Sequence, residues 1–404
     1  MTDVEELLDR LEAGDLRPYE LEEAADTPVD AMAARRRHLA DRTGAPLEAV
    51  GETALDPGVA AANIENMVGA AQVPLGVAGP VSVDGDAASG AYHLPLATTE
   101  GALVASVNRG CAVIEAAGGA TARVFRAAMT RAPVFRVAGA AEAAAVVDWV
   151  DANATRLREA AEATTSHGEL LGVDPYVVGD NVYLRFAFDT KDAMGMNMAT
   201  MATRAAAELV ETETPADLVA LSGNLCTDKK PAAINAVEGR GYTVGADVVL
   251  PDAVVEDRLH VAPDALAEVN VRKNLLGSAK AGSYGFNAQV ANVVAAMFLA
   301  TGQDEAQVVE GANAITTVDR RADGLYVGVT LASLEVGTVG GGTRLPTQAE
   351  ALELMGLAGG GDPPGANGRA LAEVVAVGAL AGELSLLGAL GSRHLAEAHE
   401  RLGR

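Results

Sequence analysis

The distribution of apolar residues changes along the chain, and these changes constrain its fold more than any single motif. Val4, Leu7, Leu8 and Leu11 recur at helical spacing until Gly14, which predicts a small helical unit at the N-terminus. From about residue 65 the chain changes to loops rich in proline and glycine, to short strands and to one helix, expected at 73–83, 94–99 and 103–114.

The middle of the chain alternates between strand and helix patterns, and long apolar helices follow it. Strands are predicted at 133–137 and 182–188, and helices at 142–158, 198–210, 287–300 and 369–390. A chain of 404 residues is also too long for one core. We therefore expect an α/β (α+β) fold with an N-terminal helical domain at 1–64, a large domain at 65–132 and 222–404, and a small domain inserted at 133–221.

The charge balance of the chain is strongly acidic. The sequence has 30 Lys and Arg against 55 Asp and Glu, a formal net charge of −25 that is spread along the chain. This acidity opposes binding to nucleic acid or to an anionic membrane, so an anionic ligand must meet a locally basic site. Abundant acids, arginine in place of lysine and few aromatics together suggest a protein adapted to high salt, where surface charge is screened.

Cysteine and histidine spacing gives no indication of a metal site. Cys111 and Cys226 are far apart and form no CxxC pair, so neither a metal cluster nor a disulfide framework is expected, and a reducing cytoplasm fits best. His394 and His399 share a predicted helix, but a spacing of five puts them on different faces.

The chain shows no sign of secretion or of membrane spanning. Its first residues include Asp3 and Glu5 in place of a basic, apolar leader. The longest apolar stretch, at 371–390, is interrupted by Glu373 and Glu383.

The segment Cys226–Asn235 carries two adjacent lysines in a chain that has only five, namely Lys191, Lys229, Lys230, Lys273 and Lys280. Lysine is a compact charge whose pKa changes readily on burial, unlike that of arginine, so this pair suggests a chemical role. The alternative is a solvated turn before Pro231.

A second group of polar residues surrounds a predicted turn from strand to helix. Glu100 would lie near the helix N-terminus, and it would need burial to act as an acid near neutral pH. Ser106, Asn108 and Arg109 follow on the helix, and Arg131 could bind a carboxylate with two parallel hydrogen bonds. A helix-start glutamate and a solvated helix face are the alternatives.

The segment Asp192–Met198 joins a predicted strand to a helix. Gly195 allows close backbone approach, and the helix N-terminus could accept a cofactor phosphate. Its three alternate methionines are equally compatible with core packing. No GxGxxG motif occurs, because Gly239-Arg240-Gly241 departs from the pattern at Val244, so a Rossmann fold is not expected.

Several of these strings occur together in one order, from about residue 5 to the C-terminus. They are ENMVG, PLGVAGP, TTEGALVAS, DAMGMNM, TDKKPAAIN, GTVGGGT and a C-terminal histidine. In this order the chain resembles the 3-hydroxy-3-methylglutaryl-CoA (HMG-CoA) reductase family. TDKKPAAIN and the N-terminal helical unit resemble its biosynthetic class, found in archaea and eukaryotes, which implies NADPH as cofactor and reduction of HMG-CoA to mevalonate.

The resemblance implies a catalytic group of Glu100, Lys229, Asp304 and His399. A buried ammonium at Lys229 would stabilise the oxyanion formed when the thioester carbonyl accepts hydride. Glu100 would donate a proton to the mevaldehyde oxygen, and Asp304 would couple Glu100 to Lys229. His399 would protonate the departing CoA thiolate. Without the resemblance, Asp304 reads as a helix N-cap and His399 as an exposed terminal residue.

The resemblance also implies the binding residues and the assembly. Substrate contacts fall on Arg131, Ser222, Asp228, Lys230, Lys273 and Asn292, CoA contacts on Ser106, Asn108 and Arg109, and NADPH contacts on Asp192, Met194, Gly195, Met196 and Asn197. It implies a small ferredoxin-like domain that holds the cofactor, a homo-oligomer with the site at a subunit interface, and no metal.

Three departures from the family are visible. Many relatives have histidine where Gln289 stands, so a proton route through this position is in doubt. Eukaryotic members carry a membrane anchor, and because nothing of that kind precedes Thr2, a soluble form is expected. Animal members have a phosphorylation switch, for which no acceptor serine is expected, because none follows His399. Two alternative functions remain, an NAD-linked degradative relative and a non-catalytic CoA-binding protein.

Overall fold

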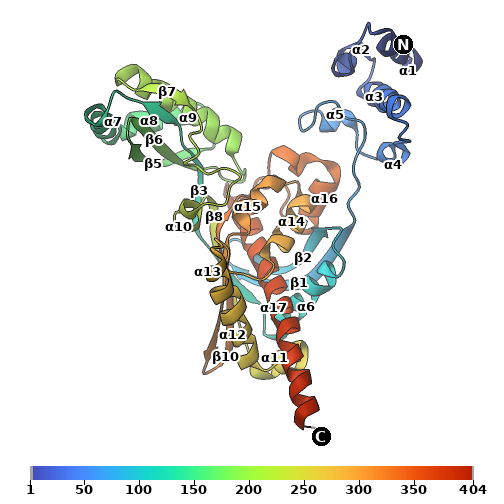
Figure 1. Cartoon of the computed structure of the whole chain (residues 1–404), viewed down its shortest axis with the longest axis vertical. Coiled ribbons are helices and arrows are strands. Elements are labelled where there is room, and N and C mark those ends of the chain that lie inside the picture. The colour runs from blue at the N-terminus through green and yellow to red at the C-terminus, as the bar shows by residue number, and fades with distance from the viewer. Residues whose placement is uncertain (1–2, 403–404) are drawn as a thin grey trace.

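The computed structural model describes the backbone of residues 3–402 and the side chains of residues 3–392. It contains an N-terminal group of helices, a small α/β unit and a large α/β unit (Figure 1). The N-terminal helices and the small unit lie toward the same end of the large unit, and they are separated from each other in Figure 1. Mixed helix and sheet, as expected from the sequence, is confirmed.

The N-terminal helices pack around a small apolar core of their own. Leu7, Leu8 and Leu11 of the first helix are buried in it, and Gly14, with φ 81°, ends that helix as predicted. The elements are α1 Val4–Ala13, η1 Pro18–Glu20, α2 Leu21–Ala24, α3 Pro28–Thr43, α4 Glu48–Gly51 and α5 Pro57–Ala60.

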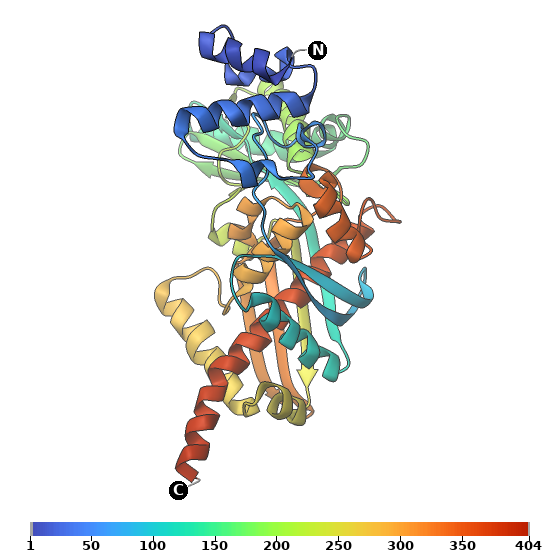
Figure 2. The ribbon, with the colours of Figure 1, turned by 90° about the vertical axis from the view of Figure 1, so that its right-hand side faces the viewer.

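The large unit is a twisted sheet whose helices pack along it (Figure 2). Its central strands follow the order β3–β8–β10–β9 with antiparallel pairing, and β1 pairs with β2 and, in parallel, with β3. The strands are β1 Leu75–Gly85, β2 Ser89–Ala97, β3 Ala120–Arg131, β8 Gly241–Leu250, β9 Ala314–Arg321 and β10 Gly324–Leu334. The helices include α6 Leu103–Ala116, α10 Ala233–Val237, α11 Asp252–Leu259, α12 Pro263–Val269, η2 Asn270–Gly277, α13 Ser278–Ala281, α14 Val290–Thr301, η3 Glu305–Gln307, α15 Val308–Gly311, η4 Gly341–Arg344 and α16 Pro346–Leu354.

The long helix α17 Ala366–Leu402 runs through the large unit. Its segment Ala366–Ser392 is long and apolar enough to cross a membrane by composition, but 83% of its apolar window is buried inside the protein. The helix is therefore the central core helix of this unit. Two acids in the described part of the helix, up to Ser392, are buried and bond to backbone: Glu373 accepts from Asp86, Ala87 and Ala88, and Glu383 from Ala288 and Gln289.

The small unit alternates strands and helices in the order strand, two helices, strand, strand, helix, strand. Its antiparallel sheet has the order β7–β4–β6–β5, and α8 packs on α9. The elements are β4 Val134–Arg136, α7 Ala140–Ala152, α8 Ala154–Glu162, β5 Glu169–Val178, β6 Asn181–Asp189, α9 Met196–Glu213 and β7 Asp217–Ala220. The single helix expected at 142–158 is wrong, because the chain breaks at Asn153 into two helices.

Strand β3 joins the two units. Residues 121–128 of β3 pair with β8 in the large unit, and Met129–Arg131 pair with β6 in the small unit. Met129 already belongs to the apolar core of the small unit. The last residues of this strand, including Arg131, are thus fixed at the junction of the two units.

Candidate active site

Lys229 lies on the loop between β7 and α10, and its ammonium Nζ forms an ion pair with Asp304 Oδ2 at 2.8 Å. The hydrogen bond to Asp304 raises the pKa of Lys229, so the ammonium stays charged. Asp304 Oδ1 also accepts the Ala306 N–H at 3.1 Å, so the carboxylate caps η3 as well. The side chain of Lys229 is 44% exposed, so the expectation of a buried ammonium is not met in the single chain.

Four further residues with expected substrate contacts gather around this loop, which we call the lysine loop (residues 222–230). Arg131 Nη1 lies 4.0 Å from Asp228 Oδ2, and Ser222 Oγ lies 3.5 Å from the thiol of the buried Cys226. Lys230 is exposed, and its ammonium donates to the Asp228 carbonyl at 3.0 Å. The loop and the neighbouring Arg131 of β3 thus bring three cations and a hydroxyl together, although the chain is acidic overall.

Glu100 lies elsewhere in the single chain, in the turn between β2 and α6. Its side chain is exposed, and its Oε1 accepts from Asn292 Nδ2 at 3.3 Å. Asn292 is in the first turn of α14, whereas Asp304 follows the end of that helix at Gly302. Ten residues of helix separate Asn292 from Gly302, which is about 15 Å along the axis. Glu100 therefore contacts the first turn of α14, and its contacts in the described part of the chain include neither Lys229 nor Asp304.

The residues expected to contact CoA lie on α6 beside α17. Ser106 Oγ lies 2.9 Å from Ser385 Oγ, and Arg109 Nε donates to the same hydroxyl at 3.0 Å. Asn108 Oδ1 accepts the Gly79 N–H at 3.1 Å. These contacts place the polar face of α6 against the middle of the long core helix.

Lys273 interacts electrostatically with Glu383, which precedes Ser385 by two residues on α17. Glu383 is buried, which raises its pKa, and the charge of Lys273 partly opposes that rise. We call Glu100, Ser106, Asn108, Arg109, Lys273 and Asn292 the α6–α14 group, and Arg131, Ser222, Asp228, Lys229, Lys230 and Asp304 the lysine-loop group. Apart from His399, the expected substrate and catalytic residues lie in these two groups.

The segment expected to bind the cofactor connects β6 to α9. Gly195 has φ 84°, and a Cβ there would lie 2.3 Å from the Thr190 side chain, so this turn requires glycine. No side chain caps α9, which leaves the N–H groups of its first turn for a ligand, and Asn197 is exposed at this end. These features fit an anionic cofactor group.

The other residues of this segment face inward. The Asp192 carboxylate is buried and accepts the N–H groups of Gly361 and Gly365, in the loop before α17, and of Gly368, in the first turn of α17. Met194 and Met196 pack against the core of the small unit, as the core-packing alternative expected.

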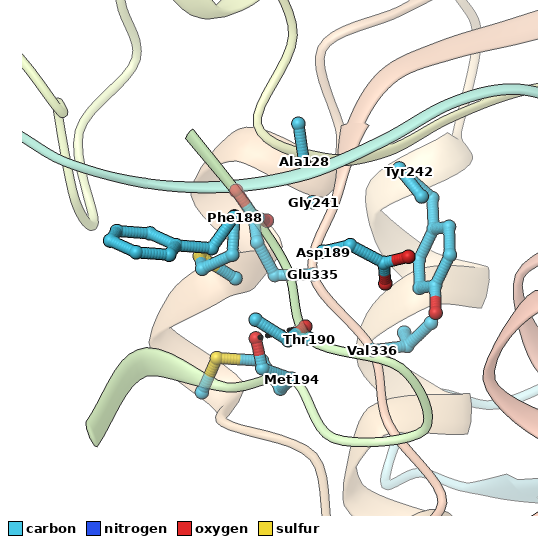
Figure 3. Close-up of a pocket in the computed structure, with 11 residues that line it drawn as sticks. Ala128, Phe188, Asp189, Thr190, Met194, Gly241, Tyr242, Glu335 and Val336 are labelled. Atoms are coloured by element: carbon cyan, nitrogen blue, oxygen red, sulfur yellow. Dashed lines mark hydrogen bonds between the residues drawn. The ribbon is translucent and has the colours of Figure 1, made fainter. Parts of the chain in front are cut away.

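A small cavity lies next to this segment, at the junction of the two units. Its lining includes Asp189, Thr190, Met194, Tyr242 and Glu335 (Figure 3). Burial raises the pKa of Tyr242 well above its usual value, so the phenol is neutral, and its hydroxyl donates to the Lys191 carbonyl at 3.0 Å. The end of β6 is thereby tied to β8.

Comparison with known proteins now identifies the family. The model of the hydroxymethylglutaryl-coenzyme A reductase family matches residues 31–404. The chain belongs to this family. It is 67% identical to the 3-hydroxy-3-methylglutaryl-coenzyme A reductase of Haloferax volcanii, covering 100% of both chains. It is also 67% identical to that of Halobacterium salinarum, covering 100% of this chain and 99% of the relative.

A solved structure shares the fold of this reductase family member at low identity. It is described as a class II 3-hydroxy-3-methylglutaryl-CoA reductase from Streptococcus pneumoniae bound to NADPH. The TM-score is 0.67 with 20% identity, and 96% of each chain is covered.

Sequence reasoning missed a buried ionic cluster beneath the lysine loop of this reductase family member. Arg240 contacts Asp228 at 3.1 Å, Glu335 at 3.1 Å and Glu310 at 3.6 Å. Gln307 also donates to Asp228 Oδ1 at 2.8 Å. The signal that could have found this cluster is the presence of single acids within apolar strings, at Glu310 and Glu335.

Two predicted positions, Gln289 and His399, remain. Gln289 donates to the Gly382 carbonyl at 2.5 Å, so its side chain is fixed to α17. His399 lies outside the residues whose side chains are described, so its role stays a prediction. Cys111 and Cys226 are free and buried.

Proposed function

We propose that this family member catalyses the NADPH-dependent, four-electron reduction of (S)-HMG-CoA to mevalonate and free CoA. The observation that supports it best is the ion pair between Lys229, on the lysine loop, and Asp304. Two further cations, Lys230 and Arg131, lie on or beside the same loop. An ammonium fixed by a carboxylate is suited to stabilise a thioester oxygen that gains negative charge. The reaction belongs to the mevalonate pathway of isoprenoid biosynthesis.

The residues divide the chemistry between them. Bound NADPH would supply the hydride for each of the two reductions. Lys229, kept charged by Asp304, stabilises the oxyanion of the first reduction, and Glu100 supplies the proton to the aldehyde oxygen in the second. His399 is predicted to protonate the CoA thiolate that leaves between the two steps.

The complete site requires a second subunit in this proposal. Glu100 and Lys229 belong to groups separated by about the length of α14, roughly 15 Å, and both side chains are exposed in the single chain. In a symmetric homo-oligomer, the α6–α14 group of one chain can face the lysine-loop group of its neighbour. That contact would also bury Lys229 and Glu100, as their chemistry requires.

The remaining binding roles follow from the two groups. Arg131, Ser222, Lys230 and Lys273 would bind the HMG carboxylate, with Asp228 and Asn292 beside them, and Ser106, Asn108 and Arg109 would bind CoA. Met194, Gly195, Met196 and Asn197 would bind NADPH at the N-terminus of α9, where the N–H groups of the first turn have no side-chain cap. We propose that Asp192 acts indirectly, because three backbone N–H groups already occupy its carboxylate.

The domain division proposed from the sequence is supported by separate apolar cores in the N-terminal, small and large units. We propose that the small unit, at 133–221, is a ferredoxin-like domain, because its sheet order β7–β4–β6–β5 with antiparallel pairing is that of a βαββαβ unit. A Rossmann fold is not part of the proposal, and a cytoplasmic location remains a prediction.

The decisive assay is NADPH oxidation, followed by absorbance, with purified protein and HMG-CoA in high salt. Lys229→Ala is the test variant, and Lys280→Ala is the matched control, because Lys280 is an exposed lysine outside both groups. We expect turnover that depends on HMG-CoA and is lost in Lys229→Ala only. Turnover with NADH alone would favour the NAD-linked degradative direction, and a folded wild type without turnover would favour a CoA-binding protein.

A further inference from the structure

The buried cluster beneath the lysine loop is unusual in its charge. Arg240, Glu310 and Glu335 each have 0% side-chain exposure, so one buried cation meets two buried carboxylates, with Asp228 as a third at the edge. Removing charged groups from water is costly unless they are paired and hydrogen-bonded. Burial raises the pKa of both glutamates, that of Glu335 by far the more. Burial therefore shifts Glu335 further toward its neutral form than Glu310.

Glu310 has a second contact that Glu335 does not share. Its Oε1 accepts the backbone N–H of Lys229 at 2.5 Å. Its position on α15, packed against β10, is fixed by the large unit. A rigid element of the core therefore binds the backbone of the proposed catalytic lysine directly.

The backbone of the lysine loop needs such a contact. Thr227 has φ 49° and Lys229 has φ 59°, in the left-handed region that residues with a Cβ rarely adopt. A non-glycine residue keeps this conformation only when its surroundings enforce it. This turn also sets the direction in which the Lys229 side chain leaves the backbone, toward Asp304.

Arg240 also holds the lysine loop, through a contact with a side chain. Its guanidinium binds the Asp228 carboxylate, one residue before Lys229, and Nη2 also lies 2.8 Å from Met196 Sδ at the start of α9. The cluster thus holds the residue before Lys229 through a side chain and Lys229 itself through its backbone.

We propose that Glu310 is a positioning residue for Lys229, which it holds in the left-handed conformation by accepting its backbone N–H, so that the ammonium meets Asp304. The effect of Glu310 on turnover rests on the proposed reductase function, whereas its effect on the Lys229 backbone does not. Glu310 touches neither substrate nor cofactor in this account. Its acceptor oxygen, rather than its charge, performs the task.

Three variants separate positioning from general stability. Glu310→Ala removes the acceptor, and Glu310→Gln keeps an acceptor oxygen of the same shape. Glu335→Ala is the matched control, because it removes an equally buried carboxylate from the same guanidinium, and the contacts described for Glu335 do not include the backbone of the lysine loop.

Hydrogen exchange of the Lys229 amide in the full chain is the first measurement, and it needs no substrate. Loss of a buried acceptor costs about 1–3 kcal/mol, so we expect exchange at least about fivefold faster in Glu310→Ala, and near the wild-type rate in Glu310→Gln and Glu335→Ala. Equal protection of this amide in Glu310→Ala and the wild type would overturn the proposal, as would equal loss in Glu335→Ala.

Steady-state kinetics in high salt is the second measurement. A misplaced catalytic group costs on the order of 10- to 100-fold, so we expect kcat to fall that far in Glu310→Ala, with little change in KM for NADPH and recovery in Glu310→Gln. A loss in Glu310→Gln as large as in Glu310→Ala would overturn the proposal. A folded wild type without HMG-CoA turnover would instead refute the proposed function, while the exchange result would still decide the role of Glu310.

Discussion

The crossing of α6 and α17 allows a sharp prediction about stability. A Cβ added at Gly110 of α6 would lie 1.9 Å from the Ala381 carbonyl oxygen of α17, whereas ordinary contact begins at 3.4 Å. The two helices would have to separate by about 1.5 Å, the difference of these values. Because the obstacle is the backbone of a helix buried in the core, it cannot rotate away as a side chain could.

The expected cost of Gly110→Ala follows from two opposing effects. Overpacking a core costs about 1–3 kcal/mol, and a backbone obstacle puts this site at the upper end. Alanine in a helix gains about 1 kcal/mol over glycine. We therefore expect the free energy of unfolding to fall by about 2 kcal/mol, measured by urea unfolding in high salt.

A matched glycine tests the reasoning. Gly277 is also helical, but a Cβ there meets only the Arg272 carbonyl at 3.4 Å, an ordinary contact. Gly277→Ala should keep or raise the stability by up to about 1 kcal/mol. The reasoning is refuted if Gly110→Ala unfolds at the same urea concentration as the wild type. Parting the helices should also weaken the contacts of Ser106 and Arg109 to Ser385, and so raise KM for HMG-CoA.

Three further predictions concern charge. Asp304 raises the pKa of Lys229 in the folded protein above its value in the unfolded chain. The stability that the ion pair contributes is therefore fully present below the unfolded pKa and is lost as pH rises through the folded pKa. Asp304→Asn should move the alkaline limb of the kcat–pH profile to lower pH, and an unmoved limb would contradict this. Glu383→Ala leaves the backbone N–H groups of Ala288 and Gln289 and the hydroxyl of Thr316 without their acceptor. The free energy of unfolding, measured with urea, should therefore fall by about 3 kcal/mol or more, with a smaller loss in Glu383→Gln. An alanine variant as stable as the wild type would count against this. Desalting should lower the melting temperature, because the repulsion of a net charge of −25 is then unscreened, and an unchanged melting temperature would remove the argument for adaptation to high salt.

Elements with strong apolar periodicity could be predicted from the sequence, and alanine-rich strands could not. The helices expected at 103–114 and 369–390 and the strand at 182–188 are confirmed within α6, α17 and β6. Strand β3 was missed because its buried positions include Ala120, Ala122 and Ala128, and alanine is neither apolar enough nor branched enough to mark a strand. The joining role of this strand was therefore invisible in the sequence.

The candidate site was predictable where its residues share a motif, and not where they meet only in space. The lysine loop and the turn at Gly195 are each one continuous segment. Arg240, Glu310 and Glu335 come from three distant segments, so their contact needs the fold of β8 and β10. The separation of Glu100 from Lys229 depends on the position of α14, which periodicity alone does not give.

The most direct test of the account mixes two inactive chains. Glu100→Ala and Lys229→Ala subunits are each purified, and then combined under conditions that allow exchange of subunits. If one site takes Glu100 from one chain and Lys229 from its neighbour, half of the randomly mixed dimers carry one intact site of two, so about a quarter of the wild-type NADPH oxidation should return. If each chain supplies both residues to its own site, every mixed site lacks one of them, and activity that stays at the level of the separate variants would contradict the account.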